Sequence, residues 1–198
     1  MEIESSSKSE IMRAAKELYQ QYGLNKTTID EIAATARKSK ATIYQFFNNK
    51  EEIFVEILME EFRSLNDFVI SEVNKQKNST DELKTYIRTT ISEAKKRLLL
   101  YSLLKGELKS CLMNHNKIKH DIDLFEKEVA KNIIYNGMQT GEFSKKYEPY
   151  LDHIAYYVIN FTRGIVLQLI LDEESNTHLK DDDVFKVLID MMIKGLKD

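Results

Sequence analysis

Apolar residues recur every three or four positions along most of the chain, with polar residues between them. This spacing is that of the apolar stripe of an amphipathic helix, and no stretch gives a convincing strand pattern. One proline and six glycines favour long uninterrupted helices. We therefore predict an all-α fold of about nine helices. They are expected at residues 7–22, 27–36, 39–47, 49–77, 80–106, 108–113, 118–141, 150–171 and 181–192.

Polar and turn-forming residues mark the expected helix ends. Ser7 with Glu10 has the spacing of a capping box at the start of the first helix, which should stop at Gly23. Asn49 can cap the fourth helix, with Glu52 at the reciprocal position of a second capping box. Pro149 fits the first turn of the eighth helix, where its missing N–H is harmless.

Two of the predicted helices, residues 27–36 and 39–47, are short and separated by about three residues. Two pairs could cap the first of them: Thr27 with Asp30, or Thr28 with Glu31. Small alanines on its inner stripe would let the two helices approach closely. This arrangement is typical of a helix-turn-helix, in which the second helix enters a DNA groove.

The second short helix has two unlike faces. Ser39 can cap its start, and Ile43 with Phe47 forms an apolar face that must pack on other helices. The outward positions are Lys40, Ala41, Tyr44 and Gln45. Small residues, a tyrosine and an amide beside basic side chains can fit a major groove and contact phosphates. A short amphipathic helix with lysines is also common as an ordinary solvated surface helix. The neighbouring helix of the predicted helix-turn-helix favours DNA contact instead.

Residues 11–54 resemble the DNA-binding domain of the tetracycline repressor (TetR/AcrR) family. The matching positions form a run without gaps: Ile11, Ala14, Ala15, Leu18, Tyr19, Tyr22, Gly23, Thr27, Thr28, Ile29, Ile32, Ala33, Ala36, Ser39, Lys40, Thr42, Ile43, Tyr44, Phe47, Lys50, Glu51, Ile53 and Phe54. The resemblance implies an all-helical homodimer with a DNA-binding domain at residues 1–49. Residues 50–198 would then bind a small molecule, change the DNA affinity and dimerise through the last two helices.

The same resemblance suggests which residues contact DNA. Thr27 or Thr28, Tyr44 and Lys50 are expected at phosphates, and Lys38, Lys40, Thr42 and Gln45 nearest to base edges. The full set of expected DNA-contacting residues is Thr27, Thr28, Arg37, Lys38, Ser39, Lys40, Ala41, Thr42, Tyr44, Gln45 and Lys50. Lys50 also opposes the dipole at the start of its helix, which a nearby phosphate would explain better than local stability.

Three positions depart from the usual family pattern. Arg37 and Lys38 replace a common Gly-Val turn, so either a non-glycine residue is left-handed there, at roughly 1 kcal/mol, or the turn differs. Ala41 replaces a frequent glycine. Phe46 stands where a tyrosine or histidine often contacts phosphate, which puts that contact in doubt.

The net charge of −3 is unusual for a DNA-binding protein until it is divided along the chain. Residues 1–50 contain eight basic and six acidic residues, whereas residues 51–198 contain 21 basic and 26 acidic residues. The basic excess is therefore N-terminal but small. Local clustering around residues 37–40, Lys50 and Lys26 must supply the attraction to DNA.

The middle helices should contain the effector site. Aromatic residues and methionine can form an adaptable apolar wall, and hydroxyl or amide groups can orient a ligand. The candidates are Phe62, Tyr86, Tyr101, Met138, Tyr156 and Asn160, each of which could also be an ordinary core residue. We expect the effector to be an apolar or aromatic molecule, and a cationic molecule of that kind is a further option.

Residues 150–171 are apolar nearly all round, which suggests burial against the core on one face and against a partner subunit on the other. One short recognition helix makes few base contacts, so a two-fold dimer on a palindromic operator is expected.

Other classes of protein are less consistent with the sequence. It lacks GxSxG, a phosphate-binding glycine loop, HExxH and paired-cysteine spacing, so we expect no catalytic site, cofactor or metal ion. We expect a transcriptional regulator, a repressor that a small apolar or aromatic molecule releases from its operator. An activator of the same fold is the closer alternative, and a helical-bundle enzyme and a purely structural dimer are distant ones. A single cysteine suits a reducing cytoplasm, no secretory signal is seen, and no uncharged run has the length of a membrane span.

Overall fold

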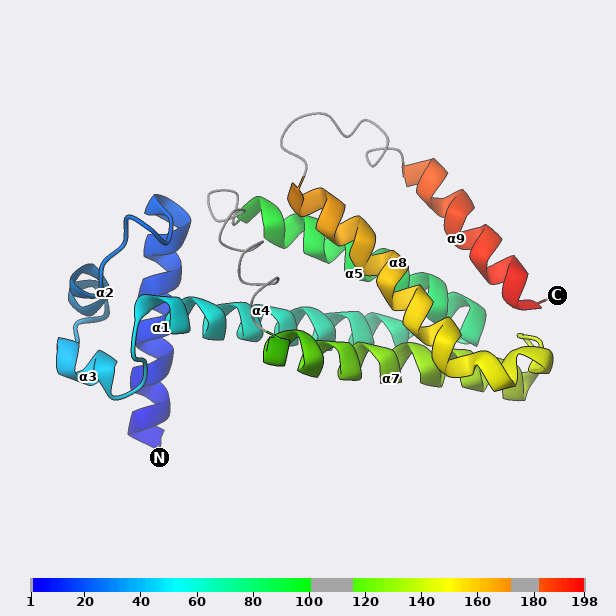
Figure 1. The fold of residues 1–198 in the computed structure, drawn as a ribbon, viewed down its shortest axis with the longest axis horizontal. Helices are drawn as coiled ribbons and strands as arrows, with labels where there is room; N and C mark the ends of the chain where they lie inside the picture. The colour runs from blue at the N-terminus through cyan, green and yellow to red at the C-terminus, as the bar shows by residue number, and fades with distance from the viewer. Residues whose placement is uncertain (1, 101–115, 172–181, 198) are drawn as a thin grey trace. The chain divides into compact units, whose positions relative to one another are not determined.

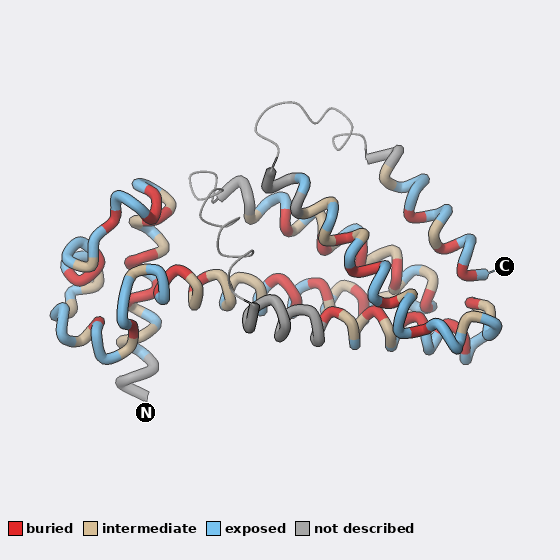
Figure 2. The backbone as a smooth tube through the Cα atoms, viewed as in Figure 1, coloured by how far each residue is buried: buried red, intermediate tan, exposed pale blue. Residues whose placement is uncertain are grey.

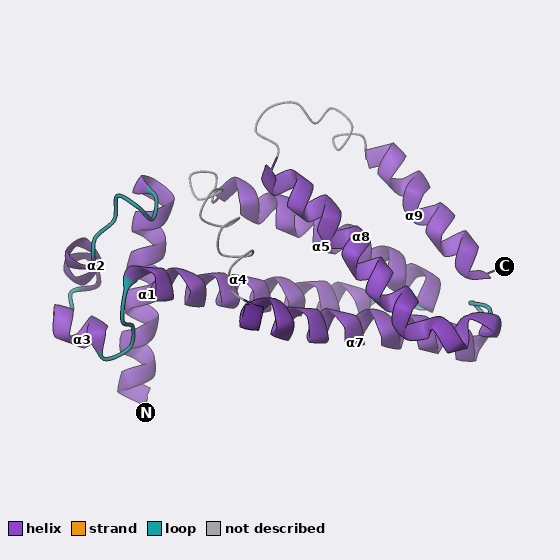
Figure 3. Cartoon of the chain, viewed as in Figure 1, coloured by secondary structure: helices purple, strands orange, loops and turns teal. Residues whose placement is uncertain are grey.

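The computed structural model describes residues 2–100, 116–171 and 182–197. Every regular element within these ranges is a helix, which confirms the predicted all-α fold (Figure 3). The elements are α1 (Glu2–Tyr22), α2 (Ile29–Ala36), α3 (Lys40–Tyr44), α4 (Lys50–Val73), α5 (Ser79–Leu100), α7 (Asn116–Thr140), the 3-10 helix η2 (Lys145–Tyr150), α8 (Leu151–Leu171) and α9 (Asp182–Lys197) (Figure 1). The short helix predicted at residues 108–113 lies outside the described ranges.

The described residues divide into two compact units. The first contains residues 2–64 and 97–100, and the second contains residues 65–96, 116–171 and 182–197. Buried and exposed positions alternate along the helices of each unit, as the amphipathic pattern requires (Figure 2). The expected domain boundary after residue 49 precedes α4, whereas the packing divides α4 itself after Ser64.

The first unit has its own hydrophobic core, built from α1 to α4. Tyr19 and Phe54 pack edge to face with ring centroids 5.9 Å apart, and the Tyr19 hydroxyl donates to the Lys50 carbonyl at 2.9 Å. The core residues are Ile11, Met12, Ala15, Tyr19, Leu24, Ile32, Ala33, Ile43, Phe47, Ile53, Phe54 and Ile57. Nearly all of them come from the apolar stripes seen in the sequence.

Two predicted helix starts are wrong. α1 begins at Glu2, so Ser7 lies inside the helix, and Ser6 donates to the Glu10 carboxylate that was expected to cap it. Nothing in the polar residues before Ser7 breaks a helix. Pro149 lies in η2 and not in the first turn of α8, which begins at Leu151.

Other predicted ends are confirmed. Gly23 follows α1 with φ +82°. The Glu52 N–H donates to Asn49 Oδ1 at 2.8 Å at the start of α4, whereas the Glu52 carboxylate accepts from the Asn48 N–H. The reciprocal bond of the capping box therefore goes to Asn48 and not to Asn49.

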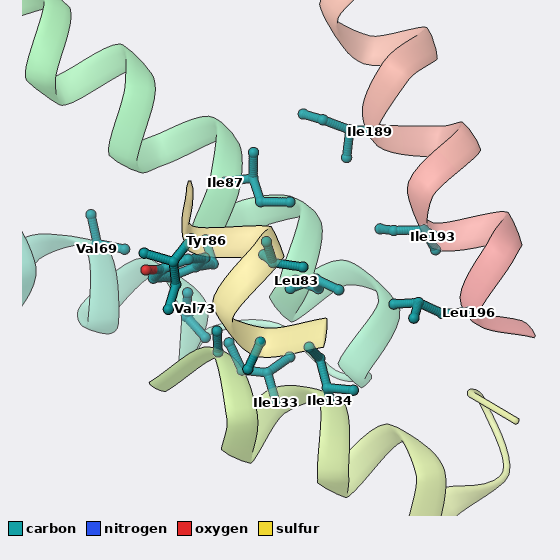
Figure 4. Close-up of a cluster of buried hydrophobic side chains, with 14 of the residues drawn as sticks. Val69, Val73, Leu83, Tyr86, Ile87, Ile133, Ile134, Ile189, Ile193 and Leu196 are labelled. Atoms are coloured by element: carbon teal, nitrogen blue, oxygen red, sulfur yellow. The ribbon is translucent and has the colours of Figure 1, made fainter. Parts of the chain in front are cut away.

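The second unit has a larger core from α4, α5, α7, α8 and α9. Figure 4 shows aliphatic side chains of several helices around Tyr86. The labelled core residues are Val69, Val73, Leu83, Tyr86, Ile87, Ile133, Ile134, Ile189, Ile193 and Leu196.

A tight turn closes α7 and connects it to α5. The Phe143 N–H donates to the Gly137 carbonyl at 2.9 Å, and Gly141 has φ +80°. A Cβ on Gly137 would lie 2.2 Å from Phe143 Cδ2, so the ring needs a glycine beneath it. The Glu142 carboxylate accepts from the N–H groups of Ser79 and Thr80 at 2.9 and 3.0 Å and so caps the start of α5.

The turn between α2 and α3 has a left-handed residue, which was one of the two alternatives for Arg37. Arg37 has φ 54° and ψ 42°, and it is the only non-glycine residue with positive φ among those the structure describes. The Lys38 N–H donates to the Ala33 carbonyl at 2.9 Å, which closes α2. The turn therefore keeps the left-handed geometry although its residue has a Cβ.

Three helices of the first unit meet at one carboxylate. Glu61 of α4 pairs with Lys16 of α1, and its Oε2 lies 2.5 Å from Arg97 Nη1 of α5. Burial would raise the pKa of Glu61, but the hydrogen bonds and charges of Lys16 and Arg97 outweigh it and hold that pKa below its usual value.

Replacing Gly137 by alanine should destabilise the protein by about 1–3 kcal/mol, because the added Cβ must displace the buried Phe143 ring. Urea unfolding would measure this. Gly195→Ala is the matched control: it lies in α9 with nothing within 4 Å of the added Cβ. Equal stability of the two variants would contradict the packing argument.

Arg37→Gly should be more stable than Arg37→Ala by about 1 kcal/mol, because alanine keeps the Cβ that makes a positive φ costly. Both variants remove the same charge, so the urea midpoints isolate the backbone effect. Identical midpoints would mean that the turn carries no strain.

Glu61→Gln should lower the unfolding free energy by about 1–3 kcal/mol at pH 7, because two cations lose their anionic partner. The folded-state pKa of Glu61 is lowered, so its stabilising charge is present above the ordinary value of 4.5 and is lost as the pH falls below it. The gap between wild type and variant should therefore shrink in acid. Urea unfolding of the wild type and Glu61→Gln at pH values from 7 to 3 would measure the difference in unfolding free energy. The exposed Glu60→Gln is the control. A difference that stays constant with pH would contradict the prediction.

Candidate nucleic-acid interface

Helix α3 is fixed from both ends and from beneath. The Thr42 N–H donates to Ser39 Oγ at 3.0 Å, which confirms the predicted N-cap. Ile43 is fully buried and Phe47 is 4% exposed, which confirms the predicted inner face. The regular helix ends at Tyr44, earlier than predicted, and Gln45 is its C-cap.

The outward face of α3 is the one predicted. Lys40, Ala41, Tyr44 and Gln45 are all exposed, and Tyr44 is 54% exposed although it is aromatic. A rigid helix thus presents a cation, a methyl group, a phenol and an amide side by side. These groups can hydrogen-bond to phosphates and base edges and can contact a thymine methyl group.

Two of the lysines near this face are paired with acids. Lys40 Nζ lies 2.5 Å from the Asp30 carboxylate, and Lys38 Nζ lies 2.6 Å from Glu10 Oε2 and 3.3 Å from Ser7 Oγ. The Lys38 hydrogen bond and charge hold the pKa of Glu10 below its usual value. The Lys40–Asp30 pair is exposed and the Lys38–Glu10 pair is partly buried, and ion pairs near a surface contribute little to stability.

The two threonines before α2 differ in role. Glu31 N–H donates to Thr28 Oγ1 at 3.3 Å, and the Thr28 N–H donates to the Glu31 carboxylate at 2.8 Å, so Thr28 and Glu31 form the capping box. Hydrogen bonds from Thr28 lower the pKa of Glu31. Thr27 is 1% exposed and donates to the Gly23 carbonyl at 2.8 Å. Thr28 is therefore the threonine at the surface.

Lys50 has hydrogen-bond partners close to it in space that the sequence did not reveal. Its Nζ donates to the carbonyls of Leu24, Asn25 and Thr27 at 2.8, 3.1 and 3.0 Å. The expectation that local structure gives no reason for this lysine is therefore wrong, because the loop before α2 points three carbonyls at it. Contact of Lys50 with a phosphate stays a prediction.

The expected effector residues do not form one group. Tyr86 is 3% exposed and Met138 fully buried, both in the second core. Tyr156 and Asn160 are exposed on α8, Phe62 is half-buried on α4, and Tyr101 lies outside the described residues. Their contact with an effector stays a prediction.

The second unit contains a partly buried ion pair that the sequence did not reveal. Arg163 Nε of α8 donates to Glu126 Oε2 of α7 at 2.6 Å, and Glu126 is 6% exposed. Arg163 was visible as an isolated charge within an apolar stretch, but nothing in the sequence identified its partner 37 positions earlier.

Neither a metal-binding cluster nor a membrane-spanning helix is found in the described ranges. There, no three histidine, cysteine, aspartate or glutamate side chains gather in a way that could hold a metal ion. None of the described helices combines the length and hydropathy needed to cross a bilayer.

Comparison with known proteins gives matches at the N-terminus and over the whole fold. Residues 11–57 match the family model described as bacterial regulatory proteins, tetR family. YhgD of Bacillus subtilis, an uncharacterized HTH-type transcriptional regulator, is 49% identical over 47 residues, which are 24% of this chain and 25% of YhgD. IcaR of Staphylococcus aureus, a negative regulator of the biofilm operon icaADBC, is 27% identical over 126 residues, or 63% of this chain and 68% of IcaR.

Solved structures match almost end to end. A transcriptional regulator from Cytophaga hutchinsonii has a TM-score of 0.70 and 25% identity, covering 95% of this chain and 97% of that one. AibR, solved with isovaleryl coenzyme A and operator DNA, has a TM-score of 0.60 and 19% identity, covering 93% and 97% of the two chains. Residues 11–57, which include the helix-turn-helix at residues 28–47, thus match the model for tetR-family bacterial regulatory proteins, and the described helices share the fold of solved transcriptional regulators.

Proposed function

We propose that this protein is a homodimeric, ligand-responsive repressor that binds a palindromic operator through α3. The observation that carries the proposal is the α3 geometry: buried Ile43 and Phe47 fix the helix so that Tyr44 and Gln45 face outward. A helix held in this way can enter a major groove without rearranging.

The exposed groups divide into positioning and base-contacting residues. Thr28 at the start of α2 and Tyr44 are suited to phosphates, and Lys50 lies close to the same loop. Lys40, Thr42 and Gln45 are suited to base edges, with the Gln45 amide able to bond adenine on two sides. Arg37 and Lys38 add charge at the turn.

The last two helices carry the exposed apolar side chains that a dimer would cover. Tyr157 of α8 is 67% exposed, and Val187, Leu188 and Met191 of α9 are 56%, 42% and 65% exposed. We infer that these side chains lie together in the dimer interface, where contact with a partner subunit would cover them. Two copies related by a two-fold axis would place two α3 helices in successive major grooves.

Regulation by a small molecule would act through α4. Its first turns place Ile53 and Ile57 in the first core, and its later turns place Val69 and Val73 in the second. A ligand that favours a different α4 position therefore changes the DNA affinity, and DNA changes the ligand affinity by the same factor.

Two related proteins support this proposal. IcaR is named as a negative transcriptional regulator, which favours repression over activation. AibR was solved with both a ligand and operator DNA, which supports control of DNA binding by a small molecule. We expect the effector to be an apolar or aromatic molecule.

Fluorescence anisotropy with DNA from upstream of the protein's own gene would test the proposal. The wild type should prefer this DNA to a scrambled sequence, with a log–log salt slope of about 0.9 for each phosphate neutralised. Tyr44→Ala/Gln45→Ala should weaken specific binding by about tenfold or more, since a lost base contact is worth about 1–3 kcal/mol.

The exposed Tyr135→Ala in the second unit is the matched control and should bind as the wild type does. If the upstream DNA is not preferred, selection from a random DNA library should recover a palindrome. Failure to enrich any sequence would refute the proposed function.

A further inference from the structure

The ammonium group of Lys50 uses all of its hydrogen-bond donors inside the first unit. Its Nζ lies 2.8 Å from the carbonyl oxygen of Leu24, 3.1 Å from that of Asn25 and 3.0 Å from that of Thr27. A lysine ammonium carries three N–H donors and no acceptor. Three donors therefore meet three acceptors, and the group can bond to a phosphate only by releasing one of these carbonyls.

The backbone of Lys50 is held as well as its side chain. The hydroxyl of Tyr19, which is 1% exposed, donates to the Lys50 carbonyl at 2.9 Å. The same first turns of α4 place Ile53 and Phe54 in the first core. The base of the lysine side chain is thus fixed by packing, and the three carbonyl bonds fix its end.

The three carbonyls belong to the loop that leads into α2, since residues 23–28 connect α1 to α2. The Thr27 carbonyl is part of the peptide group that also carries the Thr28 N–H, and this N–H donates to Glu31 Oε2 at 2.8 Å in the capping box. Because a peptide group is planar, holding the Thr27 carbonyl also fixes the direction of the Thr28 N–H. Lys50 therefore determines where α2 begins and how the exposed Thr28 is presented.

The charge of Lys50 also has a partner nearby. Hydrogen bonds from Thr28 hold the pKa of Glu31 below its usual value, and the positive charge of Lys50 adds to this effect. A lysine in the first turn of a helix opposes the helix dipole, which made a phosphate the expected partner of Lys50. The loop carbonyls and the Glu31 carboxylate supply a reason for this lysine within the protein itself.

We propose that Lys50 is a positioning residue: it supports DNA binding by fixing the start of α2 and does not itself contact a phosphate. This inference rests on the proposed function, because it assigns a role within the same DNA-binding surface. Direct contact between the ammonium and a phosphate is the alternative. The two roles differ in how DNA binding depends on salt and on the shape of the cation.

Lys50→Met and Lys50→Arg separate the two roles. Methionine removes the charge and the donors but keeps an unbranched chain. Arginine keeps the charge, but each of its terminal nitrogens carries two N–H donors and so cannot donate to three carbonyls. Both variants should weaken operator binding by about tenfold, since a loop residue that must be ordered on binding costs about that factor. The log–log salt slope should stay as in the wild type.

Amide hydrogen exchange without DNA tests the positioning itself. Exchange at Thr28 and Glu31 should become faster by about tenfold in both variants, because the bonds that order the loop are lost. Lys26→Met is the matched control, since it removes an exposed lysine of the same loop and none of the three bonds. It should exchange as the wild type does.

The wild type provides a test that remains usable even if neither variant folds. The NMR signal of the Lys50 ammonium group should be visible before DNA is added, because hydrogen bonds slow the exchange of its protons with water. Addition of operator DNA should leave the position of this signal unchanged, since the three carbonyls stay bonded.

Three results would overturn the proposal. A salt slope smaller by about 0.9 in Lys50→Met, with wild-type binding by Lys50→Arg, would indicate a direct phosphate contact. Unchanged amide exchange in both variants would mean that these bonds do not order the loop. A shift of the ammonium signal on DNA binding would mean that a phosphate replaces a carbonyl. If the wild type prefers no DNA sequence, the proposed function fails, whereas amide exchange still decides whether Lys50 holds the start of α2.

Discussion

A helix of five residues has too few internal hydrogen bonds to remain folded by itself, so the shape of α3 depends on burial of Ile43 and Phe47 in the first core. That burial determines which side chains of α3 point outward, because fixing one face of a short helix also fixes the opposite face. α1 and the first turns of α4 supply the opposing apolar surface. The Lys50 ammonium then ties the start of α4 to the loop before α2.

Local signals predicted the helices and many of their ends. Ser39, Asn49, Gly23 and Gly141 act through bonds or torsion angles within a few residues, and the structure places each where the sequence suggested. The faces of α3 were predictable for the same reason, since helical spacing alone separates Ile43 from Tyr44.

Two of the features that the sequence did not reveal depend on partners distant in sequence. Lys50 bonds carbonyls more than twenty residues away, and Glu126 meets Arg163 on another helix. Ser7 has the composition of a cap, but no residue before it ends the helix. The candidate effector residues were chosen by side-chain type, which does not determine whether a tyrosine faces the core, as Tyr86 does, or solvent, as Tyr156 does.

The pairing of Lys40 with Asp30 and of Lys38 with Glu10 has a kinetic consequence. Long-range attraction to unrelated DNA depends on uncompensated positive charge, and these acids reduce that charge close to α3. On the proposed function, weaker attraction of this kind would shorten the time that the protein spends on each wrong sequence. Its search for a target along a genome would then be limited less by trapping at competing sites than by how often it meets the target.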